Sequence, residues 1–153
     1  MAWLDRRSER GRPRAPALRS VRDDAVAAHV PEVFVVEADR SVRVSLVWLL
    51  DSLGIGALAF ASTAEFLRGV QASHGCVIVD VELRGVNKLV DFAGELRRRG
   101  LALPIVATSA DPFVSAEEIH RAGAIAFLPK PFASDALLDC LRQAALRSSA
   151  LAS

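Results

Sequence analysis

From Val33 onward, the chain alternates five times between a short apolar run and an amphipathic stretch. The apolar runs are continuous, with no polar residue at every second position, which indicates strands buried on both faces of a parallel sheet. A strand followed by a helix, repeated in this way, predicts an α/β fold in which a doubly wound sheet carries helices on both faces. The predicted strands are Val33–Val36, Gly56–Phe60, Cys76–Val79, Pro104–Ala107 and Ala124–Leu128.

The amphipathic stretches carry the start and stop signals of helices. Ser62 and Ser115 each stand three residues before a glutamate, which is the pattern of a capping box, and Ser134 is expected to cap the last helix. Three consecutive arginines precede Gly100, where the helix dipole favours cations and a glycine favours the end of a helix. The predicted helices cover residues 40–53, 62–70, 88–99, 115–123 and 134–145.

The length of 153 residues fits one domain with a tail. We predict a disordered arm over residues 1–30, a domain over residues 31–148 and a C-terminal tail over residues 149–153. The arm carries seven arginines without a helical or strand period, so it is either a solvated leader or an arm that binds phosphate or a partner. The net charge of +1 argues against general nucleic-acid binding by the whole chain.

The sequence predicts neither insertion into a membrane nor export. No apolar stretch approaches the roughly 18 residues of a membrane helix, and the N-terminus lacks the apolar core of a signal peptide. The two cysteines, Cys76 and Cys140, form no disulfide framework. We therefore expect a cytoplasmic protein with no membrane partner.

Polar side chains follow the predicted strands at the point where each strand ends. Because the carboxyl ends of parallel strands meet at one edge of a sheet, these side chains are expected to converge. Lys130 is one of only two lysines among nineteen basic residues, and its place in an apolar run suggests a movable cation for a phosphate or a carboxylate. Three acids, a hydroxyl and an ammonium suit a divalent cation and a phosphoryl group, with Asp80 as the nucleophile. The acids are Glu37 and Asp39 after the first strand and Asp80 after the third, the hydroxyl is that of Thr108 after the fourth, and the ammonium is that of Lys130 after the fifth.

The order and spacing of these segments resemble the receiver domain of bacterial two-component response regulators, and most of all its FixJ-type subgroup. The resemblance covers residues 33 to about 147. It implies a (βα)5 flavodoxin-like fold with a parallel sheet in the strand order 2-1-3-4-5. The matching segments are Val33–Val36 before the acidic cluster, Val77–Asp80, Ile105–Thr108, and Ala122–Ala124 leading to Phe127–Phe132.

The resemblance also implies how the site works. Asp80 would accept a phosphoryl group from a sensor histidine kinase or a phosphotransfer protein, and Thr108 and Lys130 would contact the phosphate. Phe127 would be the switch aromatic that reports the state of Thr108, and the Lys130–Pro131 bond would be cis. A downstream protein would bind the face formed by the fourth helix, the fifth strand and the fifth helix. No enzymatic activity is expected beyond self-phosphotransfer and autodephosphorylation at Asp80.

Ala38 departs from the family pattern, because family members carry acidic residues at the positions of both Glu37 and Ala38. The expected Mg²⁺ ligands are therefore Glu37, Asp80 and the backbone carbonyl of Glu82, with weakened metal binding as the result. Asp39 is interpreted as a cap of the following helix rather than as a replacement ligand.

The loop after Asp80 departs from the family pattern as well. It reads Leu83–Lys88 and leaves the next helix one residue further along the chain. Its cations, Arg84 and Lys88, either screen the acids of the site or lie exposed in solvent, and we favour the second interpretation.

Two functions of different class remain open. The first is a phosphorylatable switch in a two-component phosphorelay. The second is a pseudo-receiver that binds partners without phosphorylation, which the loss of an acid at Ala38 favours. A nucleotide-binding enzyme is disfavoured because residues 37–41 contain no glycine that could cradle a phosphate. We expect a stand-alone receiver that acts through protein contacts and does not bind DNA directly, and a homodimer stays open.

Overall fold

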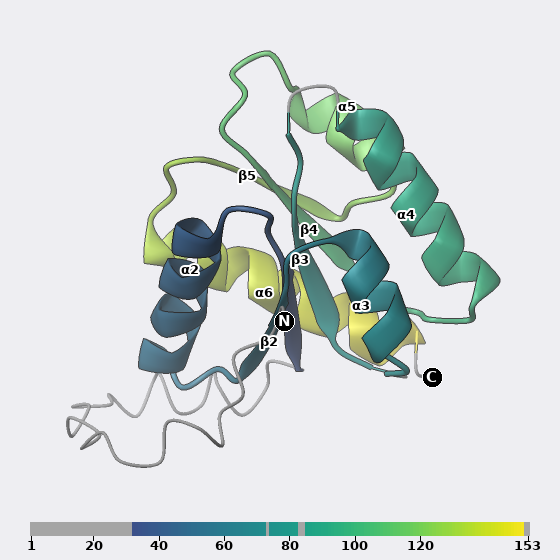
Figure 1. The fold of residues 1–153 in the computed structure, drawn as a ribbon, viewed down its shortest axis with the longest axis horizontal. Coiled ribbons are helices and arrows are strands. Elements are labelled where there is room, and N and C mark those ends of the chain that lie inside the picture. Colours follow the sequence, from purple (N-terminus) through teal and green to yellow (C-terminus); the bar gives the residue numbers. More distant parts are fainter. Residues whose placement is uncertain (1–31, 73, 83–84, 152–153) are drawn as a thin grey trace.

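One parallel sheet forms the centre of the fold. The computed structural model describes residues 32–72, 74–82 and 85–151. Its strands are β1 (Val33–Val36), β2 (Ala57–Phe60), β3 (Cys76–Asp80), β4 (Ile105–Ser109) and β5 (Ala126–Pro129). Their order across the sheet is β2-β1-β3-β4-β5 (Figure 1). The expected strand order and the α/β class are therefore confirmed.

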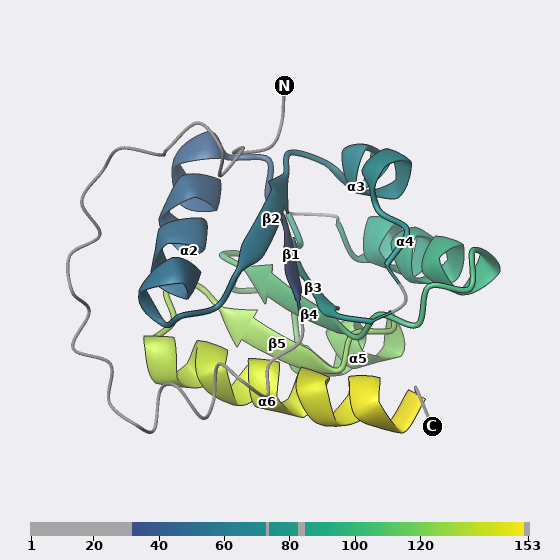
Figure 2. The same ribbon diagram turned by 90° about the horizontal axis from the view of Figure 1, so that it is seen from below.

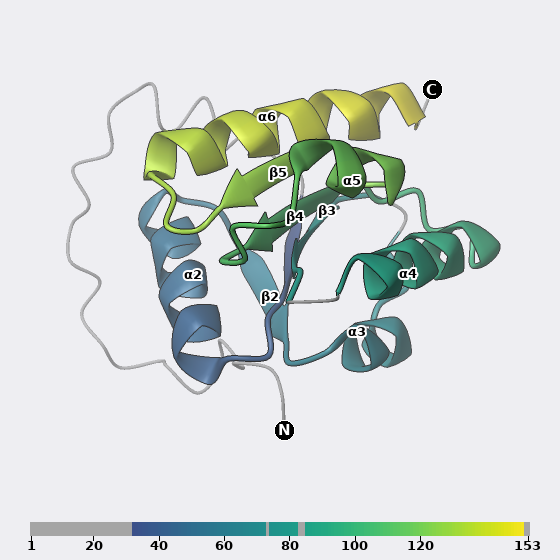
Figure 3. The same ribbon diagram turned by 90° about the horizontal axis from the view of Figure 1, so that it is seen from above.

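Helices cover both faces of this sheet. They are α2 (Arg40–Ser52), α3 (Thr63–Gly69), α4 (Val86–Arg98), α5 (Ala116–Arg121) and α6 (Ser134–Leu151). Helices α2 and α6 pack on one face, and α3, α4 and α5 pack on the other (Figures 2 and 3). The doubly wound arrangement is therefore confirmed. None of the helices among the described residues combines the length and the apolar composition of a membrane span.

The alternation of side chains along each strand divides the core into two halves. In β1, Val33 and Val35 belong to the core under α2 and α6, whereas Phe34 and Val36 belong to the core under α3, α4 and α5. All four side chains are buried. Burial on both faces explains why the strand is a continuous apolar run.

Phe66 of α3 lies at the centre of an aromatic cluster. Its side chain is fully buried, and its ring centroid lies 5.5 Å from those of Phe34, Phe60 and Phe92. The three pairs are edge-to-face, the arrangement that the charge distribution of aromatic rings favours. The cluster thereby ties α3 and α4 to strands β1 and β2.

The two predicted capping boxes form to different extents. At α5, the Ser115 hydroxyl accepts from the Glu118 backbone N–H, and the Glu118 carboxylate accepts from the Ser115 backbone N–H. At α3, Ser62 caps in the same way, but the Glu65 carboxylate accepts from the backbone N–H of Ala61. Both helices thus begin where the sequence predicts.

Several element boundaries differ from the prediction. Helix α4 begins at Val86 rather than near residue 88, and Ser134 is the first residue of α6 rather than its cap. Helix α6 continues to Leu151, beyond the expected domain limit at residue 148. The predicted arm over residues 1–30 lies outside the described residues, and so do residues 152–153. The division into arm, domain and tail therefore stays a prediction.

Candidate functional site

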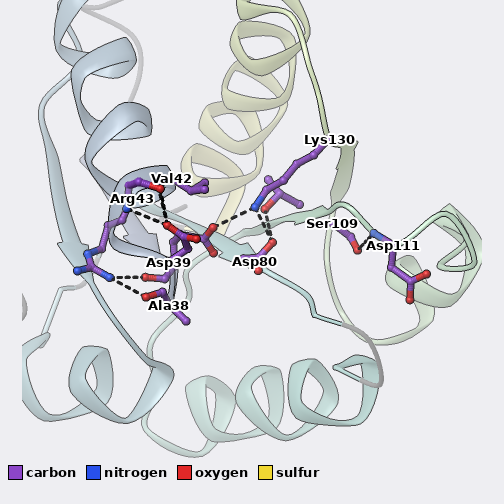
Figure 4. Close-up of polar contacts among 11 residues, drawn as sticks. Ala38, Asp39, Val42, Arg43, Asp80, Ser109, Asp111 and Lys130 are labelled. Atoms are coloured by element: carbon purple, nitrogen blue, oxygen red, sulfur yellow. Dashed lines mark hydrogen bonds and ion pairs between the residues drawn. The ribbon is translucent and has the colours of Figure 1, made fainter.

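Asp80, Thr108 and Lys130 converge at the carboxyl edge of the sheet. Asp80 ends β3 and is paired in register with Thr108 of β4, and Lys130 follows β5 directly. Lys130 Nζ lies 2.8 Å from Asp80 Oδ1, and the Thr108 hydroxyl donates to the same oxygen over a longer distance of 3.4 Å. Figure 4 shows the ion pair between Asp80 and Lys130. The juxtaposition expected from the strand ends is therefore present.

The backbone around Lys130 holds its side chain at this edge. The Lys130 N–H donates to the Ser109 carbonyl at 2.7 Å, which extends the pairing of β4 and β5 past the strand end. The Lys130–Pro131 peptide bond is cis, as the resemblance implied. The side chain of Lys130 is 21% exposed, so its ammonium is only partly hydrated.

Glu37 is the second carboxylate that Lys130 contacts. Its Oε1 accepts from Lys130 Nζ at 3.1 Å, while its Oε2 is buried and has no hydrogen-bond partner among the described residues. Burial raises the pKa of Glu37 to about 7; the hydrogen bond from Lys130 opposes this rise, and the negative charge of Asp80 adds to it. The site therefore holds a carboxyl that takes up a proton more readily than an exposed glutamate does.

Lys130 stays charged in this surrounding. Burial alone would lower the pKa of Lys130, but its hydrogen bonds and ion pairs with Asp80 and Glu37 outweigh burial and raise it. Because the stem of lysine is flexible, the ammonium can move from these two carboxylates to another anion that binds beside Asp80.

Arg43 fixes the backbone that carries Glu37. Its Nη1 donates to the carbonyls of Glu37 at 2.7 Å and Ala38 at 3.2 Å (Figure 4). Sequence reasoning missed this contact, although a signal was available. A cation near the N-terminus of a helix is disfavoured by the helix dipole, so Arg43 near the start of α2 indicates a specific partner.

Asp39 is the N-cap of α2. Its Oδ1 accepts from the backbone N–H groups of Ser41 and Val42, and from the Ser41 hydroxyl at 2.6 Å. These hydrogen bonds, the one from the Ser41 hydroxyl first, lower the pKa of Asp39. The interpretation of Asp39 as a helix cap is confirmed.

Two cavities flank Asp80. The first has a volume of about 180 Å³, and the residues around it include Ala38, Asp80, Glu82 and Lys88. The second has a volume of about 310 Å³ and lies beneath α2, where Glu37, Thr108 and Lys130 line it together with apolar side chains. A larger cavity of about 500 Å³ lies away from this site, between Leu101–Ile105 and the end of α6. Asp80 therefore lines both cavities and is open to a ligand from either one.

The first cavity offers a small set of oxygen ligands. Asp80 and Glu82 line it, and Ala38 adds only a methyl group. The Glu82 carbonyl accepts from the Gly85 N–H at 2.6 Å and keeps a second lone pair. No group of three or more acidic, histidine or cysteine side chains within the described ranges is arranged to hold a metal ion. Two protein oxygens still fit Mg²⁺, which usually takes one or two carboxylates and keeps several waters.

Glu37 lies outside the residues that line this first cavity, but it lines the cavity beneath α2 together with Asp80. Lys130 occupies its Oε1, whereas its Oε2 has no hydrogen-bond partner among the described residues. The role of Glu37 as a metal ligand stays a prediction. Sequence reasoning did not foresee the pair between Glu37 and Lys130.

Phe127 lies beside Thr108 in the sheet. It is the register partner of Ala107, the residue before Thr108, and its half-buried ring packs against the core under α3, α4 and α5. Of the two loop cations, Arg84 lies outside the described residues, and Lys88 is exposed on the first turn of α4. Lys88 is exposed, as expected, but it also lines the cavity beside Asp80, so the interpretation that it screens the acids stays open.

Comparison with known proteins gives one consistent result. Residues 33–142 match the response regulator receiver domain family. The chain is 39% identical over 115 residues to the transcriptional regulatory protein TdiR of Thauera aromatica, covering 73% of this chain and 50% of that protein. It is 34% identical over 119 residues to the transcriptional regulatory protein FixJ of Azorhizobium caulinodans, covering 76% of this chain and 56% of that protein. The chain thus spans about half the length of these relatives.

Solved structures agree with the sequence comparison. The response regulator StyR superposes with a TM-score of 0.69 at 34% identity, covering 80% of this chain and 63% of that one. The FixJ-N structure superposes with a TM-score of 0.66 at 25% identity, covering 76% and 94%. A receiver domain of the histidine kinase PA1611, solved with a magnesium ion coordinated in its active site cleft, shares the fold at 22% identity, with a TM-score of 0.63 and coverage of 76% and 98%.

Proposed function

Because the chain belongs to the response regulator receiver domain family of two-component signalling, we propose that its Asp80 accepts a phosphoryl group and that this modification is its signal. Receiver domains act as regulators that exchange phosphoryl groups with histidine kinases or phosphotransfer proteins. The observation that carries the proposal is the convergence of Asp80, Thr108 and Lys130 at one edge of the sheet. A sensor histidine kinase or a phosphotransfer protein is the proposed donor.

The transfer itself needs only the residues of this edge. A carboxylate oxygen of Asp80 attacks the phosphorus, the bond from phosphorus to the donor breaks, and an aspartyl phosphate forms. The contacts from Lys130 and Thr108 both use Oδ1, so Oδ2 of Asp80 takes part in neither. Lys130 then pairs with a phosphoryl oxygen, and the Thr108 hydroxyl donates to another. Asp80 thereby catalyses its own phosphorylation and the later hydrolysis, and no other enzymatic activity is proposed.

Mg²⁺ is the proposed cofactor. Asp80 and the Glu82 carbonyl would hold it, with the unpartnered Oε2 of Glu37 as a third ligand. When bound, the ion screens the charge of the incoming phosphoryl oxygens. Since Ala38 supplies no oxygen, we propose that the ion is held more weakly than in receivers with two adjacent acids.

The output passes through the face formed by α5, β5 and α6. Movement of Thr108 toward the phosphate frees the space that the ring of Phe127 would enter, and this changes the surface of the face. A downstream protein, or a second copy of the chain, would bind there. We propose this action in the cytoplasm, through protein contacts and without direct contact between this domain and DNA.

Incubation with acetyl phosphate and Mg²⁺, followed by a phosphate-affinity gel, tests the proposal. We expect a retarded band for the wild type and none for Asp80→Asn, which keeps the size of the side chain but removes the nucleophile. Thr108→Ala should keep the band, because Thr108 stabilises the product without forming the bond. A retarded band of equal strength in Asp80→Asn would show that another residue is modified.

Ala38 favours a second candidate function. In a pseudo-receiver, the domain would bind its partners without phosphorylation because the metal site is incomplete. The same gel separates the two functions: a band that is absent in the wild type but present in Ala38→Asp would eliminate the switch and support the pseudo-receiver.

A further inference from the structure

Both lysines of the chain line a cavity that Asp80 also lines. The sequence contains nineteen basic residues, of which only Lys88 and Lys130 are lysines. Lys130 contacts the Asp80 carboxylate from the side of β5. Lys88, from α4, lines the cavity on the other side together with Ala38, Asp80 and Glu82. Ala38, which offers a methyl group where the family pattern has an acid, therefore lines the same cavity as Lys88.

Within the described part of the chain, Lys88 has no partner that accounts for its charge. It is exposed, and no hydrogen bond or ion pair joins it to another described residue. On the same helix, Arg98 and Arg99 both bind Glu95. Lys88 also lies in the first turn of α4, which contains no acid and where the helix dipole disfavours a cation. Neither helix stability nor ion pairing explains a lysine at this position.

The charges at the site show what Lys88 would change. Apart from Lys88, Lys130 is the one cation among the described residues that pairs with the carboxylates of Glu37 and Asp80. Glu82 adds another acidic residue to the cavity that Asp80 lines. A phosphoryl donor adds further negative charge to this surplus, which a metal ion would ordinarily screen. A second ammonium on a long, flexible side chain can reach the phosphoryl oxygens from the open side of the cavity.

We propose that Lys88 supplies this second positive charge, so that phosphorylation of Asp80 depends only weakly on the weakly held Mg²⁺. The inference rests on the proposed function. It concerns how the same site neutralises the phosphoryl charge when Ala38 stands where the family pattern has an acid. With acetyl phosphate as donor, an Asp80 oxygen bonds to phosphorus while the bond from phosphorus to the acetyl oxygen breaks. Acetate leaves with the electron pair, and no proton is transferred. Lys88 and Lys130 each pair with phosphoryl oxygens during the transfer, and neither ammonium binds a metal ion.

The test measures the rate of phosphorylation by acetyl phosphate, with excess Mg²⁺ and with the metal removed by EDTA. We expect the wild-type rate to fall by less than about threefold in EDTA. Lys88→Met, which keeps the apolar stem, should fall by about tenfold or more in EDTA, the loss expected for one charge-assisted contact. Lys88→Arg is the matched control that keeps the charge, and it should resemble the wild type. Ala38→Asp should gain a rate that depends on Mg²⁺.

Calorimetric titration with Mg²⁺ gives a second readout that does not depend on phosphorylation. Because an ammonium repels the ion, Lys88→Met should bind Mg²⁺ more tightly than the wild type, and Lys88→Arg should not. An absolute requirement for Mg²⁺ in the wild type, or a rate in EDTA that Lys88→Met leaves unchanged, would overturn the inference while leaving Asp80 as the acceptor. Failure of every variant to be phosphorylated, including Ala38→Asp with Mg²⁺, would overturn the proposed function as well.

Discussion

The variant Lys130→Met tests how strongly the buried carboxylate of Glu37 and the partly buried carboxylate of Asp80 depend on one ammonium. It keeps the apolar stem and deletes the charge that lies 3.1 Å from Glu37 Oε1 and 2.8 Å from Asp80 Oδ1. Removing one partner of a buried ion pair costs about 3–5 kcal/mol, because the remaining charge stays buried without compensation. Since 21% of the Lys130 side chain is exposed and water screens part of its charge, we expect a loss of about 2–3 kcal/mol at pH 8.

This loss should grow with pH, because Glu37 can relieve the repulsion by protonation. The folded-state pKa of Glu37 is about 7, against its ordinary 4.5, and the contacts from Lys130 hold it from rising further. In Lys130→Met, the folded-state pKa of Glu37 should therefore be higher than in the wild type. A carboxyl with a raised folded-state pKa destabilises the fold progressively between its unfolded and folded pKa values. The decline in stability thus ends near pH 7 in the wild type but continues above pH 7 in the variant, by up to about 1.4 kcal/mol per pH unit.

Urea unfolding followed by circular dichroism at pH 5.5, 7 and 8.5 measures this difference. The deficit of Lys130→Met relative to the wild type should be smallest at pH 5.5 and largest at pH 8.5. Lys88→Met is the control, because Lys88 is exposed, and its free energy of unfolding should change by less than about 0.5 kcal/mol. A deficit of Lys130→Met that stays constant or shrinks as the pH rises would refute the reasoning about Glu37.

Three further substitutions test separate parts of the account by their effect on the free energy of unfolding. The wild type should lose up to about 3 kcal/mol between pH 5 and pH 7, because Glu37 is already ionised in the unfolded state but still holds its proton in the folded state. Glu37→Gln should remove this slope in urea unfolding; an unchanged slope would assign it to another group. Asp39→Ala should cost about 1 kcal/mol in thermal unfolding by removing the cap of α2, whereas Asp39→Asn, which keeps the accepting oxygen, should cost much less; equal losses would contradict the capping role. Phe66→Ala should cost about 3–5 kcal/mol in urea unfolding because a fully buried ring leaves a cavity among three aromatic neighbours, and Phe66→Leu should cost less; a loss below about 1 kcal/mol for Phe66→Ala would mean that the cluster is not packed as described.

The sheet and its carboxyl edge could be predicted because they depend on local patterns. Val33–Val36 and Cys76–Val79 are continuous apolar runs, and both lie in strands buried on both faces. Given parallel strands, the positions of Asp80 and Thr108 at strand ends are enough to bring their side chains together. The strand order, by contrast, came from the resemblance to receiver domains and not from the apolar pattern.

The contacts that tune the site could not be predicted, because they depend on side-chain direction and depth. Glu37 and Lys130 are separated by 93 positions in the chain, and only the packed structure shows that Glu37 turns toward Lys130 and is 4% exposed. A strand-end acid is equally compatible with a metal ligand, and the role of Glu37 as a ligand through Oε2 stays a prediction beside this pair. The placement of Lys88 depends in the same way on the first turn of α4. No side chain caps this helix, so the sequence did not show that it begins at Val86.

The identity of the modified residue is the most direct test of the account. After incubation with acetyl phosphate, reduction with borohydride converts an aspartyl phosphate into homoserine, and mass spectrometry of the peptides gives its position. We predict homoserine at position 80 in the wild type and at no position in Asp80→Asn. Homoserine at a different aspartate, or its absence from the wild type under every metal condition, would contradict the claim that this edge of the sheet is a phosphoryl acceptor.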